Sequence, residues 1–81
     1  MNETYQETRQ RFLRSLRTSY PGRELLSKAE TVRAYGYKDP RNADEILKGL
    51  PACIINERPR YHITDIASDM AKRYRSAKVA S

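Results

Sequence analysis

The chain has 81 residues, of which 38% are hydrophobic and 32% are charged. A chain of this length has room for one small hydrophobic core, because a domain of about 60 residues buries only about 60% of the surface that its unfolded chain exposes. Sixteen Lys and Arg residues against ten Asp and Glu residues give a formal net charge of +6, which favours a polyanionic partner over an acidic protein surface or a neutral metabolite.

Several kinds of function are disfavoured by the residues that the chain lacks. One cysteine, Cys53, cannot form an internal disulfide, and the single histidine, His62, leaves too few ligands for a structural zinc site. We find no glycine-rich phosphate loop and no set of nucleophile, base and orienting residue, so neither an enzyme nor a cofactor is expected. No apolar run is as long as a membrane span, which needs about 18 to 20 residues. The first 20 residues are polar and arginine-rich and do not resemble a signal peptide. A cytoplasmic protein is therefore expected.

The segment from Thr4 to Tyr20 predicts an amphipathic helix. Its apolar residues are spaced along one helical face, and Thr4 with Glu7 has the spacing of a capping box. The other positions carry Arg9, Arg11, Arg14 and Arg17. This cationic face is either the solvated side of a packing helix or a surface that contacts phosphates. Arg9, Arg14 and Arg17 are therefore candidates for a DNA-contact or assembly surface. Residues 1–22 are expected to form this helix and a linker.

A short helix is expected after the linker. Ser27 and Glu30 make a second capping box, which predicts a helix that begins at Lys28. Its inner face is expected to contain Tyr35, and it should end at Gly36, since glycine favours the left-handed conformation of a C-terminal cap.

A further short helix is expected to follow. Asp39 is a suitable N-cap. Pro40 is tolerated at the first helical position, because the backbone N–H that proline lacks would have no partner within the helix there. The predicted buried positions are Ala43, Ile46 and Leu47. Gly49 and Pro51 are expected to end the helix.

From Ala52 the pattern changes to that of a β-hairpin. Residues 52–55 form a branched apolar run that predicts a strand, residues 56–59 have turn chemistry, and residues 60–63 alternate between polar and apolar. The hairpin tip is expected to carry Arg58 and Arg60. We expect Cys53 to be buried, Tyr61 and Ile63 to face inward, and His62 to be exposed.

A last helix is expected from Thr64, which is predicted to be its cap. The predicted inner face contains Ile66, Ala67, Met70, Ala71 and Tyr74, and residues 77–81 are expected to fray. Tyrosines could stack on the bases of a single strand, but Tyr35, Tyr61 and Tyr74 fall on expected inner faces, which favours core packing. Tyr20 and Tyr37 are open to either interpretation.

The order of these elements predicts an α+β domain, mostly α with a small β-hairpin. It matches a winged helix-turn-helix over residues 23–76, preceded by the amphipathic N-terminal helix. Arg41 and Asn42 would lie in the first turn of the second helix. Arginine can pair with guanine and asparagine with adenine, although a surface salt link or a cap would also explain them. Lys48 is expected to contact a phosphate or nothing, whereas Asp44 and Glu45 repel phosphates unless they are paired or accept from cytosine.

Three sequence stretches between Leu25 and Tyr74 carry a resemblance to a known family: LLSKAETVRAYGY, KDPRNADEILKGLPA and RYHITDIASDMAKRY. They resemble the MerR-like winged-helix DNA-binding domains of phage and mobile-element excisionases and related small regulators. The resemblance implies that the second helix enters the major groove and that the wing contacts the backbone or the minor groove. The DNA-binding candidates are then Arg41, Asn42, Glu45, Lys48, Arg58, Arg60, Lys38 and Lys28. The arginine-rich extension before Pro21 and the acidic Asp44 and Glu45 depart from the family pattern.

The expected function is sequence-selective binding of double-stranded DNA, as an excisionase-like recombination directionality factor or a small transcriptional regulator of a phage or mobile element. A single module buries roughly 600 to 1,000 Å² on DNA, so a homodimer or a cooperative assembly is expected, with an integrase or another protein as a further partner. The rival interpretation is a protein-interaction module, an adaptor or antirepressor with the same fold. Nonspecific RNA binding is disfavoured because no stacking aromatics are expected on a sheet. DNA binding would associate the protein with the nucleoid.

Overall fold

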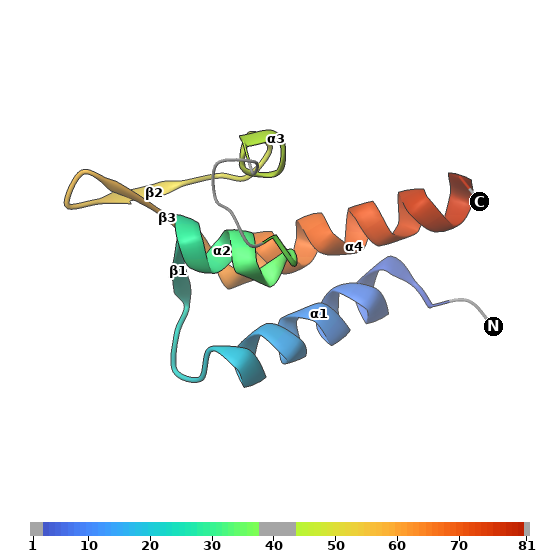
Figure 1. The fold of residues 1–81 in the computed structure, drawn as a ribbon. Coiled ribbons are helices and arrows are strands. Elements are labelled where there is room, and N and C mark those ends of the chain that lie inside the picture. Colours follow the sequence, from blue (N-terminus) through green and yellow to red (C-terminus); the bar gives the residue numbers. More distant parts are fainter. Residues whose placement is uncertain (1–2, 38–43, 81) are drawn as a thin grey trace.

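The computed structural model describes residues 3–37 and 44–80, with side chains as far as residue 74. The elements in chain order are α1 (Tyr5–Ser19), β1 (Leu25–Ser27), α2 (Lys28–Ala34), α3 (Asp44–Leu47), β2 (Cys53–Ile55), β3 (Arg58–His62) and α4 (Ile63–Ala80). The described residues thus form a small α+β structure, as the sequence predicts. Figure 1 shows α1 and α4 lying side by side in opposite directions, with the β2–β3 hairpin projecting away from the helices.

Helix α1 has the predicted capping box. The Glu7 amide donates to the Thr4 hydroxyl, and the Thr4 amide donates to the Glu7 carboxylate, both over 3.1 Å. These hydrogen bonds hold the pKa of the Glu7 carboxyl below its usual value. The buried Leu13 and Leu16 join one core cluster with residues of the sheet and of α4. The N-terminal helix is therefore part of the single core, and not a separate extension of it.

Strand β1 was not predicted from the sequence. It pairs with β3, which also pairs with β2, so the antiparallel sheet has the order β1-β3-β2. Leu26 lies opposite Tyr61 in the β1–β3 register, and both side chains are buried in the core. Tyr61 therefore faces inward, as predicted. Ile63 is also fully buried, but it is the first residue of α4 and does not belong to the strand.

The hairpin has a shorter turn than the sequence predicts. Asn56 and Glu57 have φ angles of 51° and 64°, as in a two-residue type I′ turn. Arg58 and Pro59 consequently belong to β3. Arg60 is two residues beyond Arg58 and half-buried, so its predicted place at the tip is wrong.

Proline is tolerated in the central strand because of this register. Ile55 and Arg58 flank the two-residue turn and form a hydrogen-bonded pair, so the next pair, Ile54 with Pro59, exchanges no backbone hydrogen bonds. The position at which Pro59 lacks an N–H faces the side of β1. Strand β1 ends at Ser27, opposite Arg60, so Pro59 lies beyond the residues of β3 that pair with β1.

The residues of β2 lie beyond the core. Cys53 is exposed, and Ile54 and Ile55 are 66% and 39% exposed. The prediction that Cys53 is buried is wrong, because an apolar run does not indicate how far a strand extends past the helices that could cover it.

Helix α2 begins and ends as predicted. The Glu30 amide donates to the Ser27 hydroxyl, and the Ser27 amide donates to the Glu30 carboxylate and lowers its pKa. At the other end, the Gly36 amide donates to the Arg33 carbonyl and the Tyr37 amide to the Val32 carbonyl, which is a Schellman motif. Gly36 has a φ of 91°.

The predicted start of the next helix, at Asp39 and Pro40, and its predicted buried Ala43 lie outside the described residues. In the described part, α3 buries Ile46, and Leu47 packs against the core. Leu50 is also buried in the core, so it holds the segment after α3 against the rest of the protein.

Helix α4 begins one residue before the predicted cap. The Thr64 amide donates to Nδ1 of His62 over 3.2 Å, so His62 is the capping residue and the prediction of Thr64 is wrong. The predicted inner residues Ile66, Ala67 and Ala71 are buried, but Tyr74 is 40% exposed. The Tyr74 ring packs edge-on against Phe12 at the edge of the α1–α4 contact. The backbone is helical through Ala80, so the last helix is longer than predicted.

We predict that Gly36→Ala lowers the free energy of unfolding by about 1 kcal/mol, because alanine disfavours a positive φ. A Cβ at Gly36 would meet no atom within 4 Å, so the cost is conformational only. Gly49→Ala is the matched control, since its site is equally open and its φ is outside the left-handed region. Urea unfolding should leave Gly49→Ala at or above wild-type stability; equal losses for both variants would contradict the assigned C-terminal cap.

Candidate nucleic-acid interface

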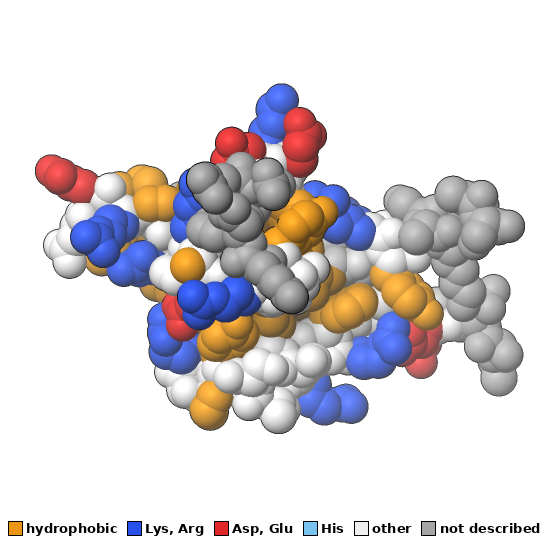
Figure 2. All heavy atoms as spheres, in the orientation of Figure 1, with side chains coloured by type: hydrophobic (Ala, Val, Ile, Leu, Met, Phe, Trp, Pro, Cys, Tyr) orange, Lys and Arg blue, Asp and Glu red, His pale blue; other side chains and the backbone are white. Residues whose placement is uncertain are grey.

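The predicted DNA-binding residues fall on several separate parts of the structure. Lys38, Arg41 and Asn42 lie outside the described residues. The others lie at the start of α2 (Lys28), in or just after α3 (Glu45, Lys48), on β3 (Arg58, Arg60) and on α1 (Arg9, Arg14, Arg17). Figure 2 accordingly shows Lys and Arg side chains in several groups on the face drawn, with acidic side chains beside some of them.

The described part of α3 carries mixed charge. The Lys28 ammonium lies 4.0 Å from the Asp44 carboxylate, so α2 and α3 are linked by an exposed ion pair. Asp44 has the i, i+4 spacing to pair with Lys48, but its carboxylate lies near Lys28. Glu45 and Lys48 are exposed. An exposed pair of this kind contributes at most about 1 kcal/mol to stability. Its main consequence is that Lys28 is partly neutralised.

The outer face of β3 carries the basic residues of the hairpin. Side chains alternate along a strand, so Arg58, Arg60 and His62 share the face opposite the buried Tyr61. These three residues form what we call the outer stripe, which is about 13 Å long at the rise of a strand. The sequence indicated the two arginines, but it did not place His62 in line with them, because that alignment depends on Tyr61 facing the core.

The three residues of the outer stripe differ in exposure and in the contacts that their side chains make within the protein. Arg58 is exposed, and its side chain makes no hydrogen bond or ion pair with any other described residue. Arg60 is half-buried and donates to the Pro59 carbonyl over 3.4 Å. The His62 ring caps α4 through Nδ1, and its Nε2 lies 3.7 Å from the Glu24 carboxylate. Arg58 is thus the member best placed for an external anion.

The arginines of α1 have different roles in the structure. Nε of Arg9 donates to the Ser68 hydroxyl over 2.9 Å, which links α1 to α4. Arg11 pairs with Glu3 at 3.1 Å and lies over the rings of Phe12 and Tyr74. Arg9 and Arg11 therefore stabilise the α1–α4 contact.

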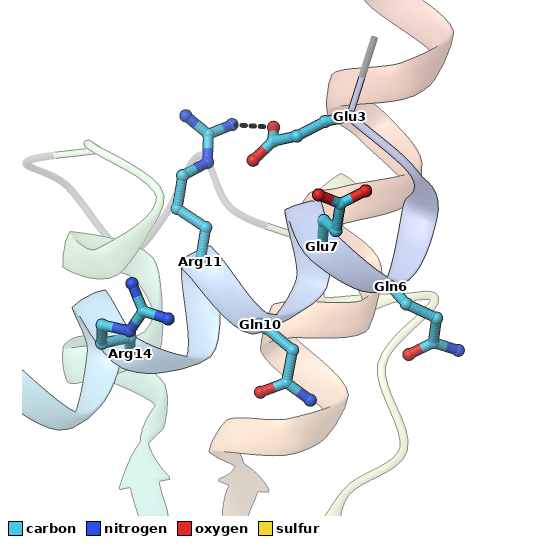
Figure 3. A pocket seen from close by; sticks show the side chains of 6 residues that line it. All are labelled: Glu3, Gln6, Glu7, Gln10, Arg11 and Arg14. Carbon is cyan, nitrogen blue, oxygen red and sulfur yellow. Dashed lines mark ion pairs between the residues drawn. The ribbon is translucent and has the colours of Figure 1, made fainter. Parts of the chain in front are cut away.

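Arg14 and Arg17 are exposed and make no side-chain pair with another described residue. Figure 3 shows Arg14 on the outer face of α1, along a shallow pocket that also carries the Arg11–Glu3 pair and Gln10. In Figure 1, α1 lies on the opposite side of α4 from α3, so a rigid ligand against α3 and the hairpin would not also contact this face.

A polar network fixes the end of α2, from which the chain leads toward α3. The Tyr35 hydroxyl donates to Oδ2 of Asp69 over 2.5 Å, and Nε of Arg73 donates to the same oxygen over 2.7 Å. The Arg73 guanidinium also lies over the Tyr35 ring, 5.7 Å from its centre. Burial, reinforced by the Asp69 carboxylate, raises the pKa of the Tyr35 hydroxyl well above its usual value. The sequence predicts that Tyr35 lies on an inner face, but it does not indicate the partners of Tyr35 on α4.

Tyr20 and Tyr37, whose roles the sequence leaves open, lie in different environments. Tyr20 packs against the core, and its hydroxyl donates to the Glu30 carbonyl over 3.2 Å. Tyr37 is 44% exposed. Tyr20 is therefore structural, and Tyr37 remains available at the surface after α2.

Comparison with protein-family models, curated proteins and solved structures finds no match to this chain. Among the described residues, no three or more His, Cys, Asp and Glu side chains are grouped as a metal site would require. None of the described helices has the length and apolar content to cross a membrane.

We predict that the Tyr35 network makes stability fall at high pH. The raised pKa means that the unfolded state loses the phenolic proton first, so stability is complete below about pH 10 and decreases as pH rises above it. Tyr35→Phe should show a smaller decrease between pH 9 and pH 11 in urea unfolding, by about 1 kcal/mol at most because the side chain is only half-buried. Tyr37→Phe is the control and should behave as wild type; identical pH profiles for all three proteins would contradict the network.

Proposed function

We propose that the protein is a winged helix-turn-helix domain that binds double-stranded DNA. The single observation that supports this best is the topology: α2 and α3 lie between β1 and β2, and β2–β3 is a hairpin in a sheet of order β1-β3-β2. In a winged helix domain, the helix-turn-helix pair occupies this place in the chain, and the hairpin that follows is the wing. In this interpretation α1 belongs to the domain and no longer counts as a departure from the family pattern.

The proposed contacts are divided between two elements. The helix that includes α3 would present its leading residues to the major groove, where Arg41 and Asn42 suit base edges by their chemistry. Arg58 on the wing would contact a phosphate or the adjacent minor groove. Its exposure and lack of a partner among the described residues support this role, whereas Arg60 and His62 are already engaged within the protein.

The biological role that fits this proposal is an excisionase-like recombination factor or a small transcriptional regulator of a phage or mobile element. Either role requires binding and no bond-breaking chemistry. Because one such module covers a limited DNA surface, two or more copies on neighbouring sites would be needed for tight binding, with an integrase or another protein as a further partner.

A protein-interaction module is the second candidate. The exposed Asp44 and Glu45 favour it, because they lie on the described part of α3 and would repel phosphates. In this case the same helix would meet a protein partner as an adaptor or antirepressor would. The two candidates differ in how strongly ionic strength affects binding.

We predict that affinity for a 20-base-pair duplex falls linearly with salt on logarithmic axes. Each phosphate neutralised by the protein contributes a slope of about −0.9, because bound counterions are released. Contact through Arg58 and two or three other cations predicts a slope between about −2 and −4 in fluorescence anisotropy titrations from 50 to 200 mM salt. No measurable binding to duplexes that include the DNA around its own gene would contradict DNA binding and favour the second candidate.

We predict that Arg58→Ala weakens binding to all duplex sequences alike and reduces the magnitude of the salt slope by about 1. Arg14→Ala removes the same charge from the face of α1 that points away from α3, and is the matched control. Its affinity should stay close to that of wild type, because Arg14 is beyond contact distance of a duplex bound at the wing. A larger loss for Arg14→Ala than for Arg58→Ala would move the DNA surface to α1.

A further inference from the structure

A groove with an apolar floor lies between α1 and α2, and we call it the α1–α2 groove. Its volume is about 290 Å³, and its floor consists of buried or half-buried side chains: Phe12, Leu16 and Tyr20 along α1, Ala34 on α2 and Met70 on α4. Figure 2 shows hydrophobic side chains in a row along the side of α1 that faces α2 and α4. None of the lining residues belongs to α3 or to the hairpin, so the proposed DNA contacts do not use this groove.

The rims of the α1–α2 groove are polar and basic. Ser15 and Ser19 are exposed on the α1 side, one helical turn apart, and Arg33 is exposed on the α2 side. The side chain of Arg33 makes no hydrogen bond or ion pair with any other described residue. A guanidinium is a donor only, and serine hydroxyls can donate as well. The rims can therefore bind carboxylates on either side of an apolar contact.

The walls of the groove favour a helix as its occupant. All the lining residues lie on helices or at their caps, and most backbone N–H and C=O groups there are bonded within the helices. An extended segment would find few backbone partners in the groove, whereas a helix satisfies its own backbone groups. From Phe12 to Tyr20 the floor is about 12 Å long at the helical rise, which matches about two turns of a docked helix.

Charge distinguishes a partner protein from a second copy of this chain. Helix α1 of a second copy is amphipathic, but it carries four arginines and Glu7 as its single acidic residue, so it would bring like charge against Arg33. The whole chain has a formal net charge of +6, which disfavours close contact between copies without a compensating anion. An acidic helix would place carboxylates against Arg33 and gain from the same charge.

We propose that the α1–α2 groove docks an acidic amphipathic helix of a partner protein. Apolar side chains at positions i, i+4 and i+7 of that helix would cover the floor, and flanking Asp or Glu side chains would meet Arg33 and the hydroxyls of Ser15 and Ser19. The hairpin and α3 would stay exposed, so a duplex and the partner could be bound together. The inference does not depend on DNA binding, since no residue of the groove takes part in the proposed DNA contacts.

A displayed library of helical peptides tests the chemistry of the occupant, because the library leaves its charge free. Each peptide has about 14 residues, or four turns, and varies among leucine, alanine, glutamate and lysine at its surface positions. Selection on the full-length wild-type protein is expected to enrich leucine at i, i+4 and i+7 with glutamate beside it. One enriched peptide is then labelled, and its affinity is measured by fluorescence anisotropy. Its addition to ¹⁵N-labelled protein should shift the amides of residues 12–20 and 33–34 most.

Two variants with matched controls separate shape from charge. Ser15→Tyr places a ring in the groove and should weaken peptide binding at least about tenfold, whereas Gln10→Tyr adds the same ring on the outer face of α1 and should not. Arg33→Glu should weaken binding about fivefold to tenfold, whereas Arg14→Glu makes the same charge change outside the groove and should have little effect. All four positions are exposed, so circular dichroism should show the wild-type fold in each variant.

Several results would overturn this inference. Selection that enriches no peptide, or enriches lysine-rich peptides or peptides without a helical period, would contradict an acidic helix as the occupant. An enriched peptide that binds Ser15→Tyr and Arg33→Glu as tightly as wild type would place its site elsewhere. A dimer of the free protein that Ser15→Tyr dissociates, seen by sedimentation, would assign the groove to self-association. Duplex binding that Arg33→Glu weakens as much as Arg58→Ala does would assign the rim to DNA.

Discussion

The packing of α1 along α4 is the interaction on which the rest of the structure depends. Leu13 and Leu16 of α1 meet Ile66 and Ala67 of α4 in one cluster, which also contains the buried residues of the sheet. Burying one aliphatic side chain fully contributes about 1.5 to 3 kcal/mol, and a chain of this size has few of them. Removing α1 would uncover this side of α4, so the hairpin and α3 would lose the body that holds them.

The position of the hairpin follows from this packing because no linker separates the hairpin from α4. Strand β3 ends at His62 and α4 begins at Ile63, whose amide donates to the Glu24 carbonyl over 2.9 Å. Ile63 is fully buried, and the His62 ring caps the helix. The direction of β3 is thus set by three contacts at one junction. Between Tyr61 and the turn, β2 and β3 extend together past the core, so Arg58 and the isoleucines of β2 are exposed.

Local chemistry in the sequence predicted the ends of α1 and α2. The capping boxes at Thr4 and Ser27 and the glycine cap at Gly36 are formed by residues three to five positions apart, so they can be identified without knowing the fold. The type I′ turn was placed less accurately, because Glu57 rarely adopts a positive φ and the arginine and proline after it also suit a turn.

Features that depend on contacts between residues far apart in the sequence could not be predicted in the same way. Strand β1 has three residues, too few for a periodic pattern, and exists because it pairs with β3. The exposure of Cys53 depends on where the helices end relative to the sheet. His62 replaced Thr64 as a cap because the turn from strand to helix occurs earlier than the side-chain preferences suggest. For the candidate site, the sequence identified Arg58 as a basic residue of the hairpin. Only the strand register shows that Arg58 lies opposite Ile55 next to the turn, whereas Arg60 lies closer to the core and is half-buried.

We propose that the face of the protein formed by the hairpin and α3 binds duplex DNA, while α1 packs behind this face. A titration of ¹⁵N-labelled protein with a duplex, followed by amide chemical shifts, tests this claim most directly. DNA binding at this face predicts the largest shifts at residues 53–60 and near α3, with the amides of residues 6–18 in α1 nearly unchanged. Shifts concentrated on α1, or a spectrum that the duplex does not alter, would contradict it.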